Sequence, residues 1–336
     1  MLRSKLIARR KCPTHRSEQI NRETVSKYSF NPEHLAVADR KRGIGAFMRT
    51  RNGADFIEPT IRSHIDHYDE IVVVYNQCED KTPDILRRLA QEFSPKLRII
   101  HYIDRVEPLG SQGHRKTDWD SPASMVNYSN FALAQTRHQI AVKLDDDHLA
   151  IPERVSALCQ NLRSGKANLD VVHCFSALNL TRGASGTLGI PAFEPAVGSG
   201  DHGYFRVMPS TYFRHDNRFE RMTYGSLKRR FAGVFYWHLK YLKKGAGFRN
   251  YELADNPDSR FARKKTRFEE SPLITLAEAK VALKPGPLDW LKASLFEKSR
   301  LTYDRDCAIQ ESFEDETVEQ ALDRLNPGWQ RLISFS

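Results

Sequence analysis

The chain has 336 residues, of which 40% are hydrophobic and 28% charged, the composition of an ordinary globular protein with a sizeable core. No run of about 18 apolar residues exists, and no apolar segment of signal-peptide length follows the basic N-terminus, so we expect neither a membrane span nor a secretory signal. The five cysteines show no CxxC spacing, which argues against structural zinc and disulfides and favours a reducing, cytoplasmic location.

The net charge of +10 is unevenly distributed. Basic residues dominate three blocks, 3–42, 228–249 and 260–267, and the second block contains no acidic residue. Such blocks attract nucleic acid, anionic lipid or an anionic small substrate, although each of them could equally be a solvated surface. The sequence has no RNP, KH or zinc-finger pattern, so we expect no nucleic-acid partner.

Residues 1–42 lack a sustained hydrophobic period and are predicted to form a basic N-terminal arm. From residue 43 onward, short apolar strands alternate with helices that carry an apolar stripe. The predicted strands are 44–48, 71–75, 97–102 and 140–144, and the predicted helices between them are 55–68, 82–93 and 121–132. This alternation indicates an α/β fold with a mostly parallel central sheet flanked by helices, in which ligands bind at the carboxyl ends of the strands.

The second half of the chain has a less regular pattern. It predicts a helix over 152–162, a strand over 171–175, a Gly- and Pro-rich loop over 183–203, a strand over 204–208 and a helix over 231–242. Charged and mostly helical residues follow. We therefore divide the chain into a basic arm (1–42), an α/β domain (43–245) and a mainly helical C-terminal extension (246–336).

The strongest chemical signal follows the fourth predicted strand, where Asp145, Asp146, Asp147 and His148 come directly after apolar residues. Burial of so much negative charge is costly unless a cation or hydrogen-bond donors compensate it. Asp145 and Asp147 are two residues apart, so in extended backbone their carboxylates point the same way and could share a hard divalent ion that also binds phosphate oxygens. The alternative is an acidic turn or a cap of the helix that begins at Pro152, but a cap accounts for one carboxylate only.

The segment Lys143-Leu144-Asp145-Asp146-Asp147-His148 resembles the DXD strand end of GT-A fold glycosyltransferases, whose fold is related to the Rossmann fold. Residues 43–240 resemble glycosyltransferase family 2 enzymes of bacterial envelope biosynthesis, which make lipopolysaccharide or capsule. The resemblance implies a GT-A-like catalytic domain over 43–245. It also implies metal-dependent transfer of a hexosyl or related group from a nucleotide sugar, a UDP-sugar first of all, to a glycan or lipid-linked glycan acceptor.

The same resemblance assigns roles to individual residues. Asp145 would contact the ribose or the water shell of a Mn²⁺ or Mg²⁺ ion, and Asp147 would ligate the ion. His238 corresponds to a late histidine that some GT-A enzymes use as a further ligand, and its alternative is a buried core residue. Further residues of the donor site would be Arg49, Arg51, Asn76 and Asp146, with Asn76 standing where many members have Asp.

Inverting transfer also needs a group that accepts the proton of the acceptor hydroxyl. Asp201, in the Gly-rich loop, is the first candidate, and Glu194 and His202 follow; the alternative for Asp201 is a turn residue. The Glu-Asp pair and the QxxRW motif of processive polysaccharide synthases are absent, which excludes that group.

Two other classes of function stay open. One is a sugar nucleotidyltransferase or other phosphotransferase on a related fold, although Arg49-Thr50-Arg51-Asn52-Gly53 lacks the glycine run of a phosphate loop. The other is a non-catalytic basic protein that binds membrane or nucleic acid.

Block 228–249 suggests a place for membrane contact, because it combines lysines with aromatic residues. We therefore expect a cytoplasmic protein that attaches peripherally to the inner face of the cell membrane. The competing interpretation places Phe235 and Leu239 in the core. The residues that would form the membrane contact are Phe231, Phe235, Trp237, Lys240, Tyr241, Lys243 and Lys244.

Overall fold

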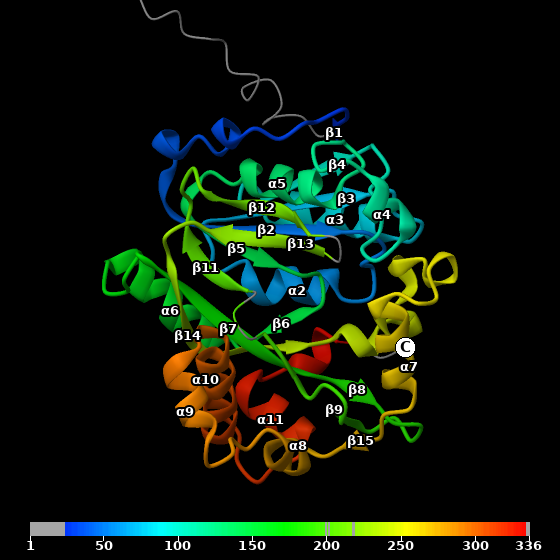
Figure 1. The fold of residues 1–336 in the computed structure, drawn as a ribbon, viewed down its shortest axis with the longest axis vertical. Helices are drawn as coiled ribbons and strands as arrows, with labels where there is room; N and C mark the ends of the chain where they lie inside the picture. Colours follow the sequence, from blue (N-terminus) through cyan, green and yellow to red (C-terminus); the bar gives the residue numbers. More distant parts are fainter. Residues whose placement is uncertain (1–23, 199, 201, 217–218, 334–336) are drawn as a thin grey trace, which may run out of the picture.

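The structure, a computed structural model, describes residues 24–198, 200, 202–216 and 219–333. Its largest element is a ten-stranded sheet in the order β1-β4-β3-β2-β5-β11-β7-β14-β6, with β10 paired to β7, and helices flank it (Figure 1). Neighbouring strands from β1 to β5 are parallel, as are β7 and β14, which confirms the predicted mostly parallel α/β fold. The strands of this sheet are β1 (Thr24–Val25), β2 (Lys41–Thr50), β3 (Glu70–Asn76), β4 (Leu97–Tyr102), β5 (His138–Leu144), β6 (His148–Ala150), β7 (Val171–Asn179), β10 (Ala196–Val197), β11 (Gly203–Arg206) and β14 (Lys228–His238).

Alternate residues of the central strands belong to two different cores, one on each face of the sheet. Ile71 and Val73 of β3 share a core with α2 (Ile57–His64), α3 (Thr82–Glu92) and α6 (Pro152–Ser164). Val72 and Val74 belong to the opposite core, which contains α5 (Met125–Gln135). Because both faces are covered, the strand is a continuous apolar run in the sequence.

The position of β2 determines where a ligand can bind. β2 lies between β3 and β5 and pairs in parallel with both. The chain runs outward from β2 through β3 to β4 and then returns to β5 on the other side, so the direction of strand order reverses at β2. Residues that follow β2 and β5 therefore face a common crevice at the carboxyl edge of the sheet.

Strand β14 contradicts the helix predicted over 231–242. It pairs in parallel with β7 and antiparallel with β6, and its second half is buried. Two bulges, between Phe231 and Gly233 and between Val234 and Tyr236, break the alternation that would have marked a strand. A buried apolar run cannot be distinguished from a buried helix by period alone, and the spacing of its aromatic residues was misleading.

Several predicted irregular regions contain strands. The loop predicted over 183–203 contains β9 (Leu188–Pro191), which pairs with β8 (Thr181–Arg182) and β15 (Leu273–Ile274), and it also contains β10. A hairpin that the sequence did not predict, β12 (Thr211–Asp216) with β13 (Phe219–Tyr224), lies against α5.

Residues 24–42, predicted as part of the basic N-terminal arm, pack onto the α/β fold. Strand β1 extends the sheet beyond β4, and two short 3-10 helices, η1 (Pro32–Leu35) and η2 (Val37–Asp39), follow it. Val25, Tyr28 and Leu35 are buried in the core that contains α5. Residues 1–23 of the predicted arm lie outside the described residues.

The C-terminal residues are mainly helical, as predicted. Their helices are α7 (Arg260–Glu269), α8 (Leu276–Ala282), α9 (Asp289–Leu295), α10 (Glu297–Ser312) and α11 (Val318–Leu325). Helices α8, α10 and α11 share a core with Trp237 of β14, whose indole donates to Asn326 Oδ1 at 2.9 Å. The amide of Asn326 also donates to the carbonyl of Ala150 in β6. The division at residue 245 stays a prediction, and this core extends across it. Among the described residues, no helix is both long and apolar enough to span a bilayer.

Candidate functional site

The three aspartates form the turn that joins β5 to β6, directly at the reversal point of the sheet. Asp146 and Asp147 are buried, and Asp145 is half-buried. None of them caps a helix, since the N-cap of α6 is Ile151, which excludes the cap alternative. The turn therefore holds three carboxylates that need other positive partners.

Asp145 lies between a lysine and an imidazole. Its Oδ1 is 2.8 Å from Lys143 Nζ, and its Oδ2 is 3.1 Å from His202 Nε2. Burial raises the pKa of the Asp145 carboxyl, but the charges of Lys143 and His202 outweigh it and hold this pKa well below its ordinary value. Asp145 is thus an anion that can accept hydrogen bonds from a ligand.

Asp146 and Asp147 share one cation, Lys243. The ammonium is 2.5 Å from Asp146 Oδ1 and 2.8 Å from Asp147 Oδ2. The second oxygen of Asp146 accepts a hydrogen bond from the Thr50 hydroxyl at the end of β2, which ties the turn to the neighbouring strand. Burial would raise the pKa of Asp147, yet Lys243 and the ring of His238 bring it well below its ordinary value, whereas the net effect on Asp146 is a raised pKa.

His238 ends β14 and points one ring nitrogen at Asp147. Its Nδ1 is 2.6 Å from Asn179 Oδ1, and Asn179 turns this oxygen toward the ring because its amide nitrogen donates to the carbonyl of Glu194. Since an amide oxygen only accepts, Nδ1 carries a proton, and Nε2, 3.4 Å from Asp147 Oδ1, is the ring nitrogen that faces the carboxylate.

These groups fit a divalent metal ion. Ligand atoms of Asp147, His148 and His238 all lie within 4.8 Å of one another. Within the described residues, Asp147 Oδ1 and His148 Nδ1 are buried without a hydrogen bond. Burial lowers the pKa of His148 well below its ordinary value, so its ring is neutral and offers a lone pair. A carboxylate with two imidazoles is a donor set for Mn²⁺ and related ions.

A pocket of about 310 Å³ opens in front of these ligands, which is enough for a small-molecule ligand. Several cationic side chains line it. They are Arg49 in β2, Arg51 just after β2, Lys143 in β5, and Lys240 and Lys243 after β14. Its wall thus combines a carboxylate turn with several positive charges, an arrangement suited to a metal-bound diphosphate.

Asn76, predicted to contact the nucleoside, also lines the pocket, but its side chain has another role. Its amide donates to the carbonyls of Tyr102 and Asp104, both at 2.7 Å, and its oxygen accepts from the backbone of Val106 at 3.2 Å. These bonds occupy the side chain, so Asn76 shapes the loop after β4 that forms one wall of the pocket.

Arg49 forms a buried ion pair that the sequence did not suggest. Its guanidinium is 2.6 Å from Glu220 Oε1 of β13 and donates to the Ser129 hydroxyl of α5 at 2.5 Å. Glu220 lines the pocket, its side chain is only 7% exposed, and its Oε2 has no hydrogen-bond partner among the described residues. The hairpin β12–β13 thus brings a fourth acidic residue to the pocket. The Thr, Tyr and Phe residues of its two strands, which are residue types enriched in strands, were the signal that could have revealed the hairpin.

The three predicted proton acceptors have different outcomes. Asp201 lies outside the described residues and stays a prediction. Glu194 accepts from the Tyr241 hydroxyl at 2.6 Å and pairs with Lys264 at 2.6 Å, and it does not line the pocket. His202 is next to the site, where it contacts Asp145.

Residues 239–252, here called the mouth segment, cross the edge of the pocket. Glu252 pairs with Arg51 at 3.1 Å and with Arg105 at 2.7 Å, and Asn250 accepts from Asn52 at 3.0 Å. These contacts tie the mouth segment, which carries Lys243, to the loops that follow β2 and β4.

The predicted membrane surface of block 228–249 is wrong in its residues. Phe235 and Leu239 are buried, as the competing interpretation required. Trp237 and Tyr241 are buried as well, and Lys243 is paired inside the site. This segment therefore presents no row of aromatic residues to a bilayer.

The chain was compared with known proteins. No family model matches it, and a search of curated proteins finds no match. Among solved structures it is similar to residues 1–349 of S. aureus TarS in complex with UDP, with 12% identity and a TM-score of 0.34 over 68% of this chain and 70% of that chain. It is also similar to glucosyl-3-phosphoglycerate synthase from Mycobacterium tuberculosis in complex with Mn²⁺, UDP-glucose and phosphoglyceric acid, with 18% identity and a TM-score of 0.27 over 48% and 52%. At identities and TM-scores this low, the reaction that the protein performs can be inferred only from the side chains of its own site.

Proposed function

We propose that this protein is a glycosyltransferase that moves a sugar from a nucleotide-sugar donor, a UDP-sugar first of all, to a glycan or lipid-linked acceptor. The observation that carries the proposal is the pairing of Asp147 with His238 at the reversal point of a parallel sheet. Asn179 orients His238 there, and a pocket of about 310 Å³ with several cations adjoins it.

The ion would be held by Asp147 and His238, with His148 beside them and Asp145 toward its water shell. When bound, a Mn²⁺ or Mg²⁺ ion offsets the negative charge that gathers on the leaving diphosphate.

Basic side chains of the protein also stabilise the negative charge of the diphosphate. Arg51, Lys143 and Lys243 border the pocket and attract the diphosphate, and Asp145 can accept a hydrogen bond from a ribose hydroxyl. Asp146 takes no part as a ligand in this proposal, because Thr50 and Lys243 occupy both of its oxygens.

Glu220 is our candidate for the proton acceptor. In the transfer, the acceptor oxygen forms a bond to the anomeric carbon while the bond from that carbon to the phosphate oxygen breaks, and the electron pair leaves with the nucleoside diphosphate. The hydroxyl proton passes to Oε2 of Glu220, the oxygen that the ion pair with Arg49 leaves without a partner. Asp201 is the competing candidate.

Titration calorimetry with UDP, in the presence and absence of Mn²⁺, tests the proposal. We expect UDP to bind more tightly with Mn²⁺, and we expect Asp147→Ala to remove that gain while the thermal unfolding profile stays cooperative. A screen of nucleotide sugars for Mn²⁺-dependent hydrolysis then identifies the donor. A protein that binds neither UDP nor any other nucleoside diphosphate with Mn²⁺ present would not be a glycosyltransferase of this kind.

A further inference from the structure

Exposed large apolar side chains cluster on the C-terminal helices. Nine such side chains occur among the described residues, and five of them lie within residues 288–296. Leu295 is 69% exposed and Trp290 is 56% exposed, although the adjacent Ala293 is buried. We call this group the α9 surface; its members are Leu288, Trp290, Leu291, Leu295 and Phe296.

The α9 surface extends around a short helix and its ends. Leu288, Leu291 and Leu295 recur at spacings of three and four residues, so they share a face of the helix, whereas Trp290 lies on a different face and Ala293 is buried where α9 packs on α10. Figure 1 places α9 at the outer edge of the molecule. A soluble monomer rarely leaves so many large apolar side chains together in water, so the surface has a partner.

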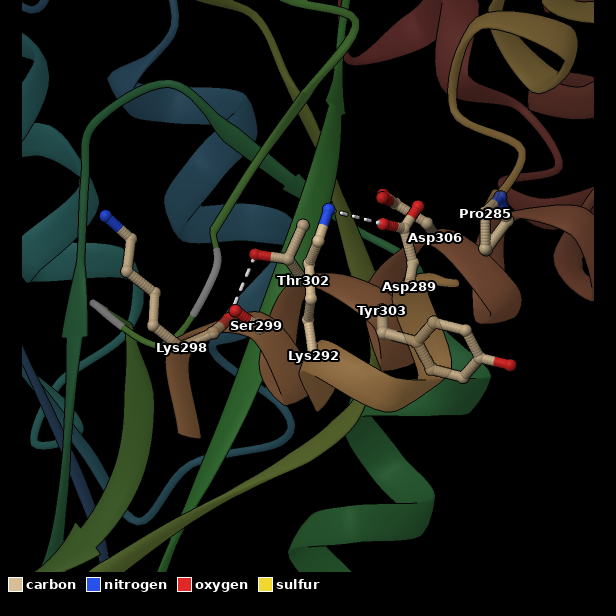
Figure 2. Close-up of a pocket in the computed structure, with 8 residues that line it drawn as sticks. All are labelled: Pro285, Asp289, Lys292, Lys298, Ser299, Thr302, Tyr303 and Asp306. Carbon is tan, nitrogen blue, oxygen red and sulfur yellow. Dashed lines mark hydrogen bonds and ion pairs between the residues drawn. The ribbon is translucent and has the colours of Figure 1, made fainter. Parts of the chain in front are cut away.

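Three exposed lysines lie near the α9 surface. They are Lys284, Lys292 and Lys298, and Lys284 and Lys298 form no ion pair with any described residue. A hollow of about 270 Å³ between α9 and α10 is bordered by Lys292 and Lys298 and also by the carboxylates of Asp289 and Asp306. Figure 2 shows Lys292 turned toward Asp289 at 3.4 Å, while Lys298 extends away from the carboxylates. Trp, Phe and Leu with flanking lysines are the composition of a helix that lies in the interface of an anionic bilayer.

A second copy of the chain fits the α9 surface less well. A two-fold contact brings the same patch of both copies together, so the lysines of one copy would face those of the other.

We infer that the α9 surface is the site at which this protein binds an anionic lipid bilayer. The side chains of Leu288, Leu291 and Leu295 insert among the headgroups, Trp290 lies beside them at the level of the headgroups, and Lys292 and Lys298 contact lipid phosphates. The inference does not depend on the proposed enzymatic activity, since it concerns a different part of the surface.

Co-sedimentation of the full-length protein with vesicles tests this inference. Vesicles of phosphatidylcholine with phosphatidylglycerol should retain the protein at low salt, and phosphatidylcholine alone should not. The double variant Trp290→Ser/Leu295→Ser should weaken binding at least tenfold, and Lys292→Glu/Lys298→Glu should weaken it at low salt only. The matched control is Trp119→Ser, because Trp119 is equally exposed, at 55%, but lies outside the α9 surface.

Three results would overturn the inference. The first is a full-length protein that ignores anionic vesicles at low salt, and the second is equal binding by wild type and the Trp290→Ser/Leu295→Ser variant. The third is a concentration-dependent dimer, seen by light scattering, that the same double substitution converts to monomer, which would assign the surface to a second copy. Thermal unfolding and UDP titration with Mn²⁺ should be unchanged in every variant. A negative result in the vesicle assay can therefore be distinguished from failure of the proposed glycosyltransferase function.

Discussion

Asn179 accepts a hydrogen bond from Nδ1 of His238 at 2.6 Å, and this contact determines which ring nitrogen faces Asp147. Asn179 is fully buried on β7, and its amide nitrogen is held by the carbonyl of Glu194 at 2.7 Å. The orientation of the histidine therefore depends on the sheet itself, through the pairing of β7 with β14.

This contact leads to the first prediction. Asn179→Leu should lower the affinity for Mn²⁺ about 10- to 100-fold, because the ring of His238 loses the partner that fixes its tautomer and direction. Asn179→Asp, which keeps an acceptor, is the matched control and should lose much less. Electron paramagnetic resonance of free Mn²⁺ measures both variants. Equal affinity in wild type and Asn179→Leu would mean that His238 is not a ligand.

The second prediction concerns Lys243. Lys243→Met leaves two buried carboxylates without their shared cation, so without divalent ions the free energy of unfolding should fall by about 3–5 kcal/mol. Mn²⁺ should restore part of this loss in the variant. Lys244→Met is the control, since Lys244 is exposed and contacts Asp55 through its backbone. Urea titrations with EDTA and with Mn²⁺ give the comparison, and an equal loss in both variants would contradict the role assigned to Lys243.

The third prediction decides between two proton acceptors. If Glu220 takes the proton, Glu220→Gln should reduce kcat about 10²- to 10⁴-fold with little change in UDP affinity, and Asp201→Asn should have a small effect. Glu194→Gln should also have a small effect, because Glu194 is paired with Lys264 away from the pocket. The reverse order, with the large loss in Asp201→Asn, would move the role to the loop.

The fourth prediction is a pH dependence of stability that arises outside the site. Burial lowers the pKa of His64 to about 3, so the folded state keeps this ring neutral where the unfolded chain, with a pKa near 6.5, binds a proton. The unfolded state then binds more protons, and stability falls as the pH drops below about 6.5, by about 1.4 kcal/mol for each pH unit down to about pH 3.

His64→Asn, whose amide can replace the bond from Nδ1 to the Thr60 carbonyl at 2.7 Å, removes this titration. Urea unfolding at pH 7.5 and pH 5.5 should show a difference about 1.4 kcal/mol smaller in the variant than in wild type. Identical differences in the two proteins would show that His64 does not titrate on unfolding.

The sequence predicted those elements whose apolar residues form either one continuous run, as in a buried strand, or one stripe along a helix. Strands β2 to β5 and the helices between them follow from apolar runs and from the stripe of Leu86 and Leu89. The strand β14 was not predictable from periodicity. Its two bulges shift the alternation of side chains between the two faces of the sheet, and it pairs with a strand on each side, β7 and β6. The hairpin β12–β13 was overlooked because its residues are only partly buried.

The site was predictable only where its residues are consecutive or resemble a known motif. Asp145 and Asp147 belong to one strand end, and the resemblance supplied His238. Lys243 lies 97 residues beyond Asp146 on an irregular segment, so nothing in the sequence placed its ammonium between two carboxylates. Glu220 reaches the pocket only because the hairpin packs on α5, a tertiary contact without a local signal.

The two hydrogen bonds of Asn326 have a consequence for how the protein is made. They join the end of α11 to Trp237, the neighbour of His238, and to Ala150 in β6, the strand that begins with His148. During synthesis the first strands of the sheet can form early, but the strands that carry the two histidines lack this support until Asn326 has left the ribosome. The nascent chain is therefore expected to bring His148 and His238 into their final geometry only after α11 has been made.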